Sequence, residues 1–324
     1  MLNRAIFIIG CTGSGKGALG LELARRLHAE IVSLDSMKVY RRMDIGTAKP
    51  PADIRREIPH HLIDVVEPYE EFSVARYVEL ATAAITDIQS RGKPALVVGG
   101  TPMYLKALTE GLFEGPSADP DIRNRLMNEA AQQGTPHLHQ RLTLLDPKAA
   151  TRIHPNDLRR IIRGLEVHEL TGRPITDLQE QWDRDRKRFD FILLGVRRER
   201  EDQNHRTNLR VKRMIEGGLV DEVRALLAEP EPLSETARQA LGYAEIIEHL
   251  RGKTALDDAV ERIKINTRQF AKSQRTWFRR FQDIQWIDVK PDDRPDSIAD
   301  SIIRIAGFLR AAGFSLRDPA CEPE

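Results

Sequence analysis

The sequence predicts an α/β fold with a parallel sheet, a helical insertion and C-terminal helices. Short continuous apolar runs, which are typical of buried parallel strands, alternate with helical patterns in the N-terminal part of the chain. Residues 121–188 carry mostly helical patterns, and no convincing strand interrupts them. Alternating strands and helices favour a parallel sheet, and a length of 324 residues allows about two domains.

The N-terminal elements follow in order. Ala5–Ile9 is the first predicted strand, and it ends at a Gly-rich turn. Leucines at helical spacing predict a helix over Ala18–Leu27, and Ile31–Leu34 is the second strand. Ser73 is expected to N-cap a further helix, which leads to a third strand at Ala95–Val98. This order indicates strand–helix–strand units of a parallel sheet.

The later elements return the chain to the same sheet. We predict a core of residues 1–120 and 189–324, interrupted by a helical insertion over residues 121–188. Gly172 and Pro174 end one helix of the insertion. Phe191–Val196 is a buried strand, and Gln285–Ile287 is a possible short one. The rest of the C-terminal part is predicted to be helical.

Composition excludes several classes of protein. Hydrophobic residues make up 40% of the chain and charged residues 31%, as in soluble globular proteins, and the formal net charge is only +1. Cys11 and Cys321 cannot form a four-ligand zinc site, and so few cysteines fit a reducing compartment. The first apolar run is too short for a signal peptide or a membrane helix. We therefore expect a cytoplasmic protein without a membrane segment.

A Gly-rich loop follows the first strand and opens the first helix. The pattern Gly10-x-x-x-x-Gly15-Lys16 is the P-loop motif, in which backbone amides, a helix N-terminus and a lysine cradle phosphates. It predicts a P-loop NTPase-like core and a diphosphate or triphosphate ligand. The predicted phosphate-binding residues are Gly10, Cys11, Thr12, Gly13, Ser14, Gly15, Lys16 and Gly17.

The loop departs from the motif at its last position. Gly17 stands where a Ser or Thr hydroxyl normally binds magnesium. Mg²⁺ must then be held by phosphate oxygens, water and other side chains, or be bound less well. Two alternatives for the loop remain, a dinucleotide fingerprint with Asp35 about 20 residues on, and a turn without ligand. The fingerprint would leave Lys16 without a role.

A carboxylate, Asp35, follows the second predicted strand. Ligands of open α/β sheets bind at the carboxyl ends of strands, which would place Asp35 beside the phosphate loop. A carboxylate there can act as a general base or bind magnesium. Alternatively, Asp35 caps a helix.

Several longer motifs identify a family. The sequence closely resembles the bacterial type of the tRNA dimethylallyltransferase (tRNA isopentenyltransferase) family from about Ala5 to Trp286. The motifs are Asp35-Ser36-x-x-x-Tyr40, Met43–Pro50, Pro59–Asp64, Gly99-Gly100-Thr101-x-x-Tyr104, His154–Asp157, Gln239–Tyr243 and Thr267-Arg268-Gln269-x-Ala271-Lys272-x-Gln274.

The resemblance implies a reaction and roles for residues. A dimethylallyl group would move from dimethylallyl diphosphate to N6 of an adenosine next to the anticodon of a tRNA, releasing diphosphate. The loop with Lys16 would hold the diphosphate, Asp35 would be the general base, and Thr101 would contact the adenine and the base. Arg210 would stabilise the diphosphate, with Arg206 one helical turn earlier. A monomer is expected.

The resemblance also implies contacts to the tRNA anticodon stem-loop. Lys38 lies in one contact stretch, where many members of the family have Gln. The implied tRNA-binding residues are Asp35, Ser36, Met37, Lys38, Thr101, Arg123, Arg159, Arg160, Ile161, Ile162, Arg163, Gln239, Ala240, Leu241, Gly242, Tyr243 and Ala244.

A basic stripe in the C-terminal helical part adds to this surface. Lys264, Arg268, Lys272, Arg275 and Arg279 recur at spacings of four and three. A second stripe, about one residue away, is expected to pack on the core and consists of Ile263, Phe270, Trp277 and Phe281. The basic stripe suits phosphate contact, although a solvated helix face has the same pattern.

Three other functions share these features. A P-loop small-molecule kinase shares the core, but Gly17 weighs against Mg²⁺–ATP. A prenyltransferase of free adenine nucleotides shares the site, but it has no use for an RNA-facing surface. A catalytically silent tRNA-binding protein would bind anticodon stem-loops and leave them unmodified. His60, His61 and His154 are expected to be structural and not to bind metal.

Overall fold

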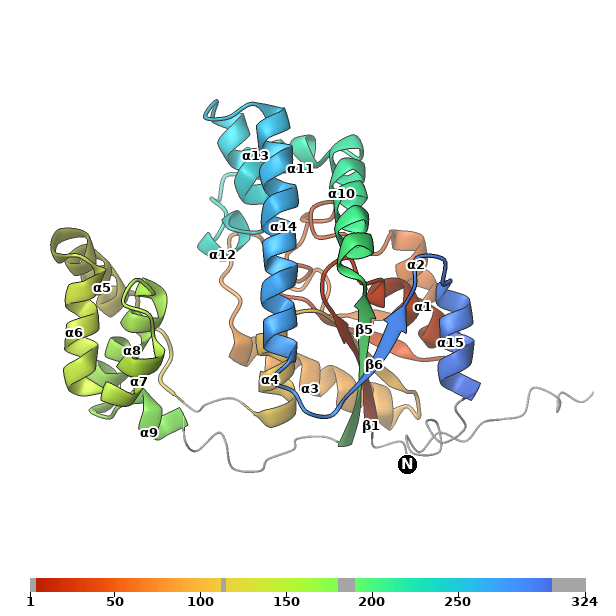
Figure 1. The fold of residues 1–324 in the computed structure, drawn as a ribbon, viewed down its shortest axis with the longest axis horizontal. Helices are drawn as coiled ribbons and strands as arrows, with labels where there is room; N and C mark the ends of the chain where they lie inside the picture. Colours follow the sequence, from red (N-terminus) through yellow and green to blue (C-terminus); the bar gives the residue numbers. More distant parts are fainter. Residues whose placement is uncertain (1–3, 112–114, 180–189, 305–324) are drawn as a thin grey trace, which may run out of the picture. The chain divides into compact units, whose positions relative to one another are not determined.

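The computed structural model describes residues 4–111, 115–179 and 190–304. It divides into two compact units (Figure 1): Met1–Leu108 with Phe189–Glu324, and Thr109–Arg188. The second unit begins at Thr109 and not at residue 121. The physical reason is that the segment before the first insertion helix is tied to that unit, since Arg163 and Glu166 bond to the backbone of Pro116 and Asp119.

The first unit contains one parallel sheet with strand order β3-β2-β4-β1-β5-β6. The strands are β1 (Arg4–Gly10), β2 (Glu30–Leu34), β3 (His60–His61), β4 (Ala95–Gly99), β5 (Asp190–Arg198) and β6 (Ile284–Val289). All five strand pairs run parallel. The five strands expected from the sequence are confirmed. β3 was missed because two residues carry no periodic pattern.

Helices cover both faces of this sheet (Figure 1). On one face, α1 (Lys16–Leu27) and α15 (Pro295–Arg304) bury a core that includes Ile8, Leu23 and Ile302. On the other face, α3 (Val74–Ser90) packs on β2 and β4, and α14 (Leu256–Phe278) packs on β1. The remaining helices are α2 (Ala52–Glu57), α4 (Pro102–Glu110), α10 (Arg200–Glu216), α11 (Leu219–Leu227), α12 (Glu235–Arg238) and α13 (Tyr243–Leu250).

The second unit is helical, as expected, and has its own core. Its helices are α5 (Pro120–Gln133), α6 (Thr135–Leu145), α7 (Pro147–Arg152), α8 (Leu158–Thr171) and α9 (Ile175–Gln179). Leu126, Leu142 and Leu165 lie at the centre of the core and are fully buried. Gly172 caps α8 in the left-handed conformation, at φ 68°.

Helix boundaries elsewhere follow local chemistry. Ser73 caps α3, and its hydroxyl accepts a hydrogen bond from the backbone of Arg76. The stripe expected to pack α14 on the core is wrong in part, since Phe270 is 43% exposed. The buried face consists instead of Ala259, Ile263, Ala271, Gln274 and Phe278. Residues spaced by exactly seven do not stay on one face of a helix with 3.6 residues per turn. On the buried face, the small Ala271 and the polar Gln274 take the place expected for Phe270.

A buried carboxylate joins the N-terminal ends of β2 and β3. Glu30 is 3% exposed and accepts hydrogen bonds from Arg91 and Lys93, which lie at and after the end of α3. His61 of β3 lies 2.8 Å from the same carboxylate. These partners, Arg91 above all, hold the pKa of Glu30 well below its ordinary value.

Replacing Glu30 by Gln should lower the stability of the fold at neutral pH by about 1–3 kcal/mol, because a buried charge network loses its centre. The pKa of Glu30 is lowered by folding, so this contribution is complete above the ordinary value of 4.5 and is lost as the pH falls below it. Thermal unfolding of both proteins from pH 7 towards pH 3 measures the effect. A Tm difference that does not narrow with acid would contradict it.

Candidate active site

The carboxyl ends of β1, β2 and β4 bring the predicted loops together. The backbone N–H groups of Gly100 and Thr101 both donate to the carbonyl of Leu34, at 3.1 and 3.2 Å. A side chain at Gly99 would lie 2.1 Å from that same carbonyl oxygen. Only glycine allows this approach, which joins the end of β4 to the residue before Asp35.

The phosphate loop connects β1 to α1. Gly13 and Gly15 adopt left-handed backbone angles, with φ of 80° and 93°. Lys16 is the first residue of α1, and its ammonium donates to the carbonyl of Cys11 at 3.2 Å. The loop therefore has the turn, the helix N-terminus and the lysine that phosphate binding requires.

Thr12 of this loop is held by three side chains from the C-terminal helices. Its N–H donates to Gln274 Oε1 at 2.8 Å, and its carbonyl accepts from Gln203 Nε2 at 2.6 Å. Its hydroxyl accepts from Arg210 at 3.3 Å. Gln274 also donates to the carbonyl of Gly100 at 2.6 Å. One α14 side chain thus links the phosphate loop to the turn that carries Thr101.

Arg275 supports the same arrangement from the next position of α14. It is partly buried and donates to Gln203 Oε1 at 2.6 Å, which leaves the Gln203 amide nitrogen directed at Thr12. Arg198 of β5 donates to the carbonyl of Ser14 and pairs with Asp202. Neither Gln203 nor Arg198 was predicted to belong to the site. Both lie on elements distant in sequence from the loop, so no local pattern marks them.

Asp35 and Thr101 lie at adjacent turns. Asp35 Oδ1 accepts from the backbone N–H groups of Met37 and Lys38, at 2.9 and 3.3 Å. Thr101 Oγ1 accepts from the N–H of Ser36 at 3.2 Å. One carboxylate oxygen of Asp35 thus fixes the turn. In this bond Thr101 uses an oxygen lone pair and not its hydroxyl proton.

Three cations surround Asp35. Lys16, Lys38 and Arg210 each interact electrostatically with its carboxylate. Burial lowers the pKa of Lys16 to about 8, and burial also lowers the pKa of Lys38 and of Arg210. These positive groups outnumber the carboxylate, and a local excess of positive charge favours a bound anion.

Arg206 lies one turn before Arg210 on α10, as expected. Its pKa is lowered by partial burial and by the neighbouring charge of Arg198. Arg206 is more exposed than Arg210. It extends the positive region outward from the phosphate loop.

The loop does not fit a magnesium ion held by protein ligands. Gly17 offers no hydroxyl, and one oxygen of Asp35 is already engaged by backbone amides. No group of three or more His, Cys, Asp or Glu residues suited to a metal occurs in the parts of the chain that the structure describes. A diphosphate fits the loop, whereas a dedicated metal site does not.

In the second unit, the predicted tRNA-binding residues fall into two classes. Arg159 and Arg160 are exposed at the start of α8, where Arg160 lies 3.4 Å from Asp157, and such exposed guanidinium groups suit contact with a phosphate backbone. Ile161 and Ile162 are buried in the helical core, so their role is to hold α8 in place. Arg163 is partly buried and reaches the Glu166 carboxylate at 2.6 Å.

Arg123 shares that carboxylate. Glu166 is fully buried, and its carboxylate lies 2.8 Å from Arg123 Nε. Arg123 and Arg163 are therefore oriented by one internal acceptor. A rigid pair of guanidinium groups is better suited to phosphate recognition than freely rotating ones.

The stretch Gln239–Ala244 connects α12 to α13 and includes the first two residues of α13. Gln239 is exposed and Leu241 and Ala244 are partly buried, whereas Ala240, Gly242 and Tyr243 are buried. Tyr243 packs against Gly46 so closely that a side chain there would lie 2.3 Å from its ring. This places two of the motifs in contact.

Glu222 of α11 completes that contact. It accepts from the N–H groups of Asp44 and Ile45 at 2.9 and 2.8 Å, and from the Tyr243 hydroxyl at 2.6 Å. The Met43–Pro50 motif is therefore anchored to α11 and α13. Tyr243 itself is fully buried.

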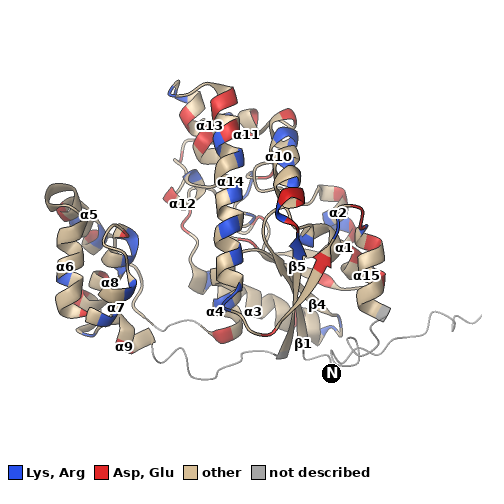
Figure 2. Ribbon diagram, in the orientation of Figure 1, with Lys and Arg blue, Asp and Glu red and all other residues tan. Residues whose placement is uncertain are grey.

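The basic residues of the α14 stripe lie in different environments. Figure 2 shows basic residues along α10 and α14. Arg268 donates to Asn208 of α10 at 2.8 Å, and Lys264 pairs with Glu261. Lys272 and Arg279 are exposed. The expectation of a single outward stripe is wrong, because Arg268 and Arg275 turn towards α10.

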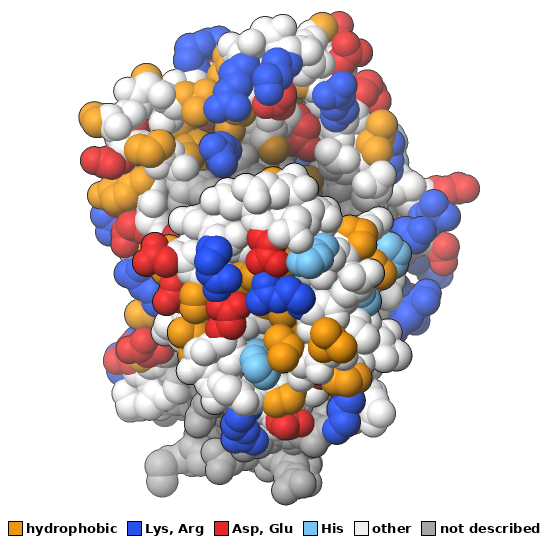
Figure 3. Space-filling view, turned by 90° about the vertical axis from the view of Figure 1, so that its left-hand side faces the viewer, with side chains coloured by type: hydrophobic (Ala, Val, Ile, Leu, Met, Phe, Trp, Pro, Cys, Tyr) orange, Lys and Arg blue, Asp and Glu red, His pale blue; other side chains and the backbone are white. Residues whose placement is uncertain are grey.

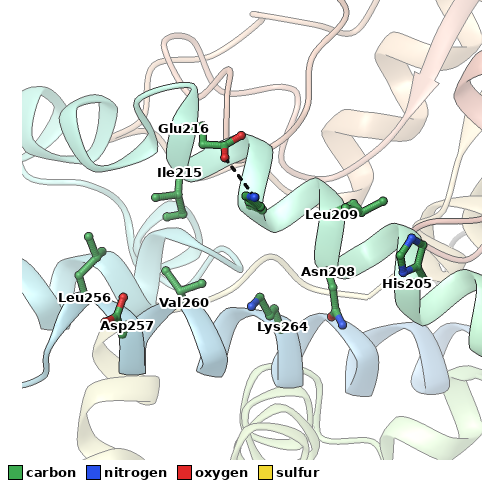
Figure 4. Close-up of a pocket in the computed structure, with 10 residues that line it drawn as sticks. His205, Asn208, Leu209, Ile215, Glu216, Leu256, Asp257, Val260 and Lys264 are labelled. Atoms are coloured by element: carbon green, nitrogen blue, oxygen red, sulfur yellow. Dashed lines mark ion pairs between the residues drawn. The ribbon is translucent and has the colours of Figure 1, made fainter.

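Two further surface features lie outside the predicted catalytic residues. A groove of about 450 Å³ runs between α10 and α14 (Figure 4), and residues such as Leu209, Val260 and Lys264 line it. It contains none of the predicted catalytic side chains. On the face shown in Figure 3, basic and acidic side chains are interspersed. No helix in the described ranges is long and apolar enough to cross a membrane.

A family model described as IPP transferase matches residues 38–281. The chain is 49% identical to the tRNA dimethylallyltransferase of Geobacter metallireducens, over 88% of this chain and 93% of the relative. It is 44% identical to the tRNA dimethylallyltransferase of Acetivibrio thermocellus, over 93% of this chain and 96% of the relative.

Solved structures give the same result. The tRNA isopentenylpyrophosphate transferase of Bacillus halodurans is 38% identical, with a TM-score of 0.71 over 96% of this chain and 98% of that one. A eukaryotic dimethylallyltransferase acting on tRNA is 29% identical, with a TM-score of 0.81 over 98% of this chain and 81% of that one. The predicted P-loop NTPase-like core with a parallel sheet is confirmed.

The structure assigns different roles to two cations of α14, and these roles can be separated. Arg275→Ala should weaken binding of inorganic diphosphate by about tenfold, because the Gln203 amide loses the partner that orients it towards Thr12. It should leave the salt dependence of RNA binding unchanged. Exposed Lys272 is the matched control: Lys272→Ala should spare diphosphate and reduce the slope of log K against log salt by about 1.

Calorimetry with diphosphate and RNA titrations at several salt concentrations measure both effects. If Arg275→Ala reduced the salt dependence of RNA binding and left the diphosphate affinity intact, Arg275 would be an RNA-binding residue and would not support the phosphate loop.

Proposed function

Because this chain belongs to the IPP transferase family, we propose that it transfers a dimethylallyl group from dimethylallyl diphosphate to N6 of an adenosine next to the anticodon of a tRNA. The chain is a prenyltransferase that acts on tRNA, as its relatives' names state for them. Beyond this shared activity, we propose the identity of the prenyl donor and the position of the modified adenosine in the tRNA.

One observation supports the donor most strongly. Lys16 lies at the N-terminus of α1 in the phosphate loop, and Arg210 donates to the Thr12 hydroxyl of that loop at 3.3 Å. A diphosphate ester would supply the negative charge that these cations favour. Loop amides and these cations would stabilise the charge that the leaving diphosphate gains in the transition state.

The chemistry needs a base next to the leaving group. The adenine N6 attacks C1 of the dimethylallyl group, a C–N bond forms, and the C1–O bond breaks with its electron pair leaving on diphosphate. The N6 proton becomes acidic as the new bond forms, and Asp35 accepts it. One Asp35 oxygen is held by the turn, so the other is the acceptor. The Thr101 hydroxyl would orient the adenine.

The adenine must leave its stack to reach these groups. Extruding a base costs a few kcal/mol, and less in a single-stranded loop than in a duplex. The exposed Arg159 and Arg160 of α8 and Lys272 of α14 offer charges to the RNA backbone. An anticodon-loop adenine is therefore an accessible target.

The proposed site also bears on the oligomeric state, the cellular location and the metal. Every proposed catalytic residue comes from one chain, so a monomer suffices. A tRNA substrate places the reaction in the cytoplasm. Any Mg²⁺ would arrive on the diphosphate, held by its oxygens and by water, since residue 17 provides no hydroxyl.

A mass measurement tests the proposed function. The protein is mixed with dimethylallyl diphosphate and an anticodon stem-loop RNA that has an adenosine next to the anticodon. A dimethylallyl mass increment without ATP is expected. A requirement for ATP would favour a small-molecule kinase, and RNA that is bound but unmodified would favour a catalytically silent binder.

Asp35→Asn should reduce single-turnover prenyl transfer by roughly 10²–10⁴-fold, because the proton acceptor is lost. The amide oxygen can still accept from Met37 and Lys38, so the turn and the RNA affinity should be nearly intact. RNA binding is measured in parallel. An equal loss of RNA binding and turnover would show that Asp35 positions RNA and is not the base.

A further inference from the structure

A buried lysine outside the proposed catalytic set, Lys49, lies in the Met43–Pro50 motif. Its side chain is only 2% exposed. Its ammonium donates to the carbonyl of Tyr40, to Asp44 Oδ1 at 2.7 Å and to Asp64 Oδ1 at 2.6 Å. An ammonium has three protons, and these three bonds use all of them. Lys49 therefore has no donor left for a bound diphosphate, and it can act only through the groups that it holds.

Asp64 connects this lysine to the turn of the proposed base. One of its carboxylate oxygens accepts from Lys49, and the other accepts from Arg55 at 2.6 Å. The backbone N–H of Asp64 donates to the carbonyl of Lys38 at 3.1 Å. The N–H of Lys38 in turn donates to Asp35 Oδ1 at 3.3 Å. Lys38 is thus bonded through its backbone to Asp64 on one side and to Asp35 on the other.

The backbone beyond Lys38 is bonded in the same way. The N–H groups of Val65 and Val66 both donate to the carbonyl of Val39, at 2.8 and 3.0 Å. The N–H of Arg41 donates to the carbonyl of Val66 at 2.9 Å. The two segments therefore hold each other along their length, so a displacement of one would move the other.

The backbone around these bonds is strained. Within the described ranges, four of the five non-glycine residues with positive φ lie in this part of the chain, and they are Arg42, Ala48, Leu62 and Asp64. Such conformations persist where surrounding contacts impose them, and they cluster at functional sites. At Asp64, where φ is 57°, the bond from Lys49 is one of those contacts. Without Lys49, Asp64 would be less constrained, and the segment bonded to it would shift.

We propose that Lys49 is a positioning residue for prenyl transfer: by holding Asp64, it sets the orientation of the Asp35 carboxylate towards the adenine. The inference rests on the proposed function, which assigns Asp35 as the proton acceptor. Lys49 touches neither the adenine nor the diphosphate, and no proton moves to or from it during transfer. Its removal therefore acts on the rate of transfer and not on the affinity for diphosphate.

Single-turnover transfer at saturating dimethylallyl diphosphate and anticodon stem-loop RNA tests the proposal, with binding of inorganic diphosphate measured by calorimetry in parallel. Lys49→Met should slow transfer by about 10²-fold, since a shift of about 1 Å at a reacting group can cost this much. The diphosphate affinity should stay unchanged, because Thr12 of the phosphate loop is held by Gln274 and Gln203. Transfer and diphosphate affinity that fall together would overturn the proposal.

Glu30→Gln is the matched control. Glu30 lies at the start of β2, whereas Asp35 follows the end of the same strand, and Glu30 is the centre of another buried charge network. Both Glu30→Gln and Lys49→Met should lower the Tm, but only Lys49→Met should slow transfer. If the rate followed the Tm in both variants, Lys49 would be a structural residue only.

A double substitution shows whether the effect passes through Asp64. Asp64→Asn removes the charge that Lys49 holds and keeps the backbone N–H that donates to Lys38, so it should also slow transfer. The double variant should be little slower than the slower single variant, since both changes break one link. Effects that multiply would contradict this, as would a folded single variant with wild-type transfer. If Lys49→Met does not fold, the rate of Asp64→Asn alone decides.

Hydrogen exchange separates this proposal from the proposed function. The amides of residues 36–41 should exchange faster in Lys49→Met than in the wild type or Glu30→Gln, because the bonds that protect them loosen. Faster exchange, in a protein whose wild type transfers nothing to RNA, would remove the proposed function and keep Lys49 as the residue that sets this turn. Wild-type transfer, with the exchange and the rate of Lys49→Met unchanged, would leave the function standing and remove the role of Lys49.

Discussion

The organisation of this protein depends on a buried excess of positive charge at the carboxyl edge of its sheet. Lys16, Lys38 and Arg210 share a single carboxylate, Asp35, and burial works against all three charges. Such a cluster is unfavourable in the free protein and becomes favourable when a multiply charged anion enters. The close approach of β4 to β2 at Gly99 keeps Asp35 next to the turn that carries Thr101, where the proposed reaction would take place.

The second constraint is the attachment of the phosphate loop to the C-terminal half of the chain. Thr12 is bonded through its N–H, its carbonyl and its hydroxyl to Gln274, Gln203 and Arg210. A loop that is flexible in isolation is thus fixed by helices more than 190 residues away. Helix α14 carries the exposed Lys272 two residues before Gln274, so one rigid element presents charge to RNA and holds the diphosphate loop. A displacement of α14 by bound RNA would be felt directly at Thr12.

The sequence predicted the fold because its signals are local. The strand–loop–helix context of Lys16 and the order of short apolar runs were sufficient for the sheet, apart from β3. The motifs brought Asp35, Thr101 and Arg210 into the prediction through resemblance. Gln203 and Arg198 were missed because their roles depend on tertiary contacts. Arg275 was assigned to RNA because spacing along a helix does not tell which neighbour a side chain faces. Ile161 and Tyr243 are among the residues implied to bind tRNA, yet both side chains are fully buried.

The most direct test of the account is the proton balance of diphosphate binding. Burial holds the pKa of Lys16 at about 8 in the free protein, so at pH 8.5 most of this lysine is neutral. A bound diphosphate should raise that pKa, and the protein should take up protons. Titration with dimethylallyl diphosphate at pH 8.5, in buffers of different ionisation enthalpy, measures this uptake, since phosphate oxygens are already ionised there. Proton uptake is the predicted result. Binding without uptake, or with proton release, would contradict the account.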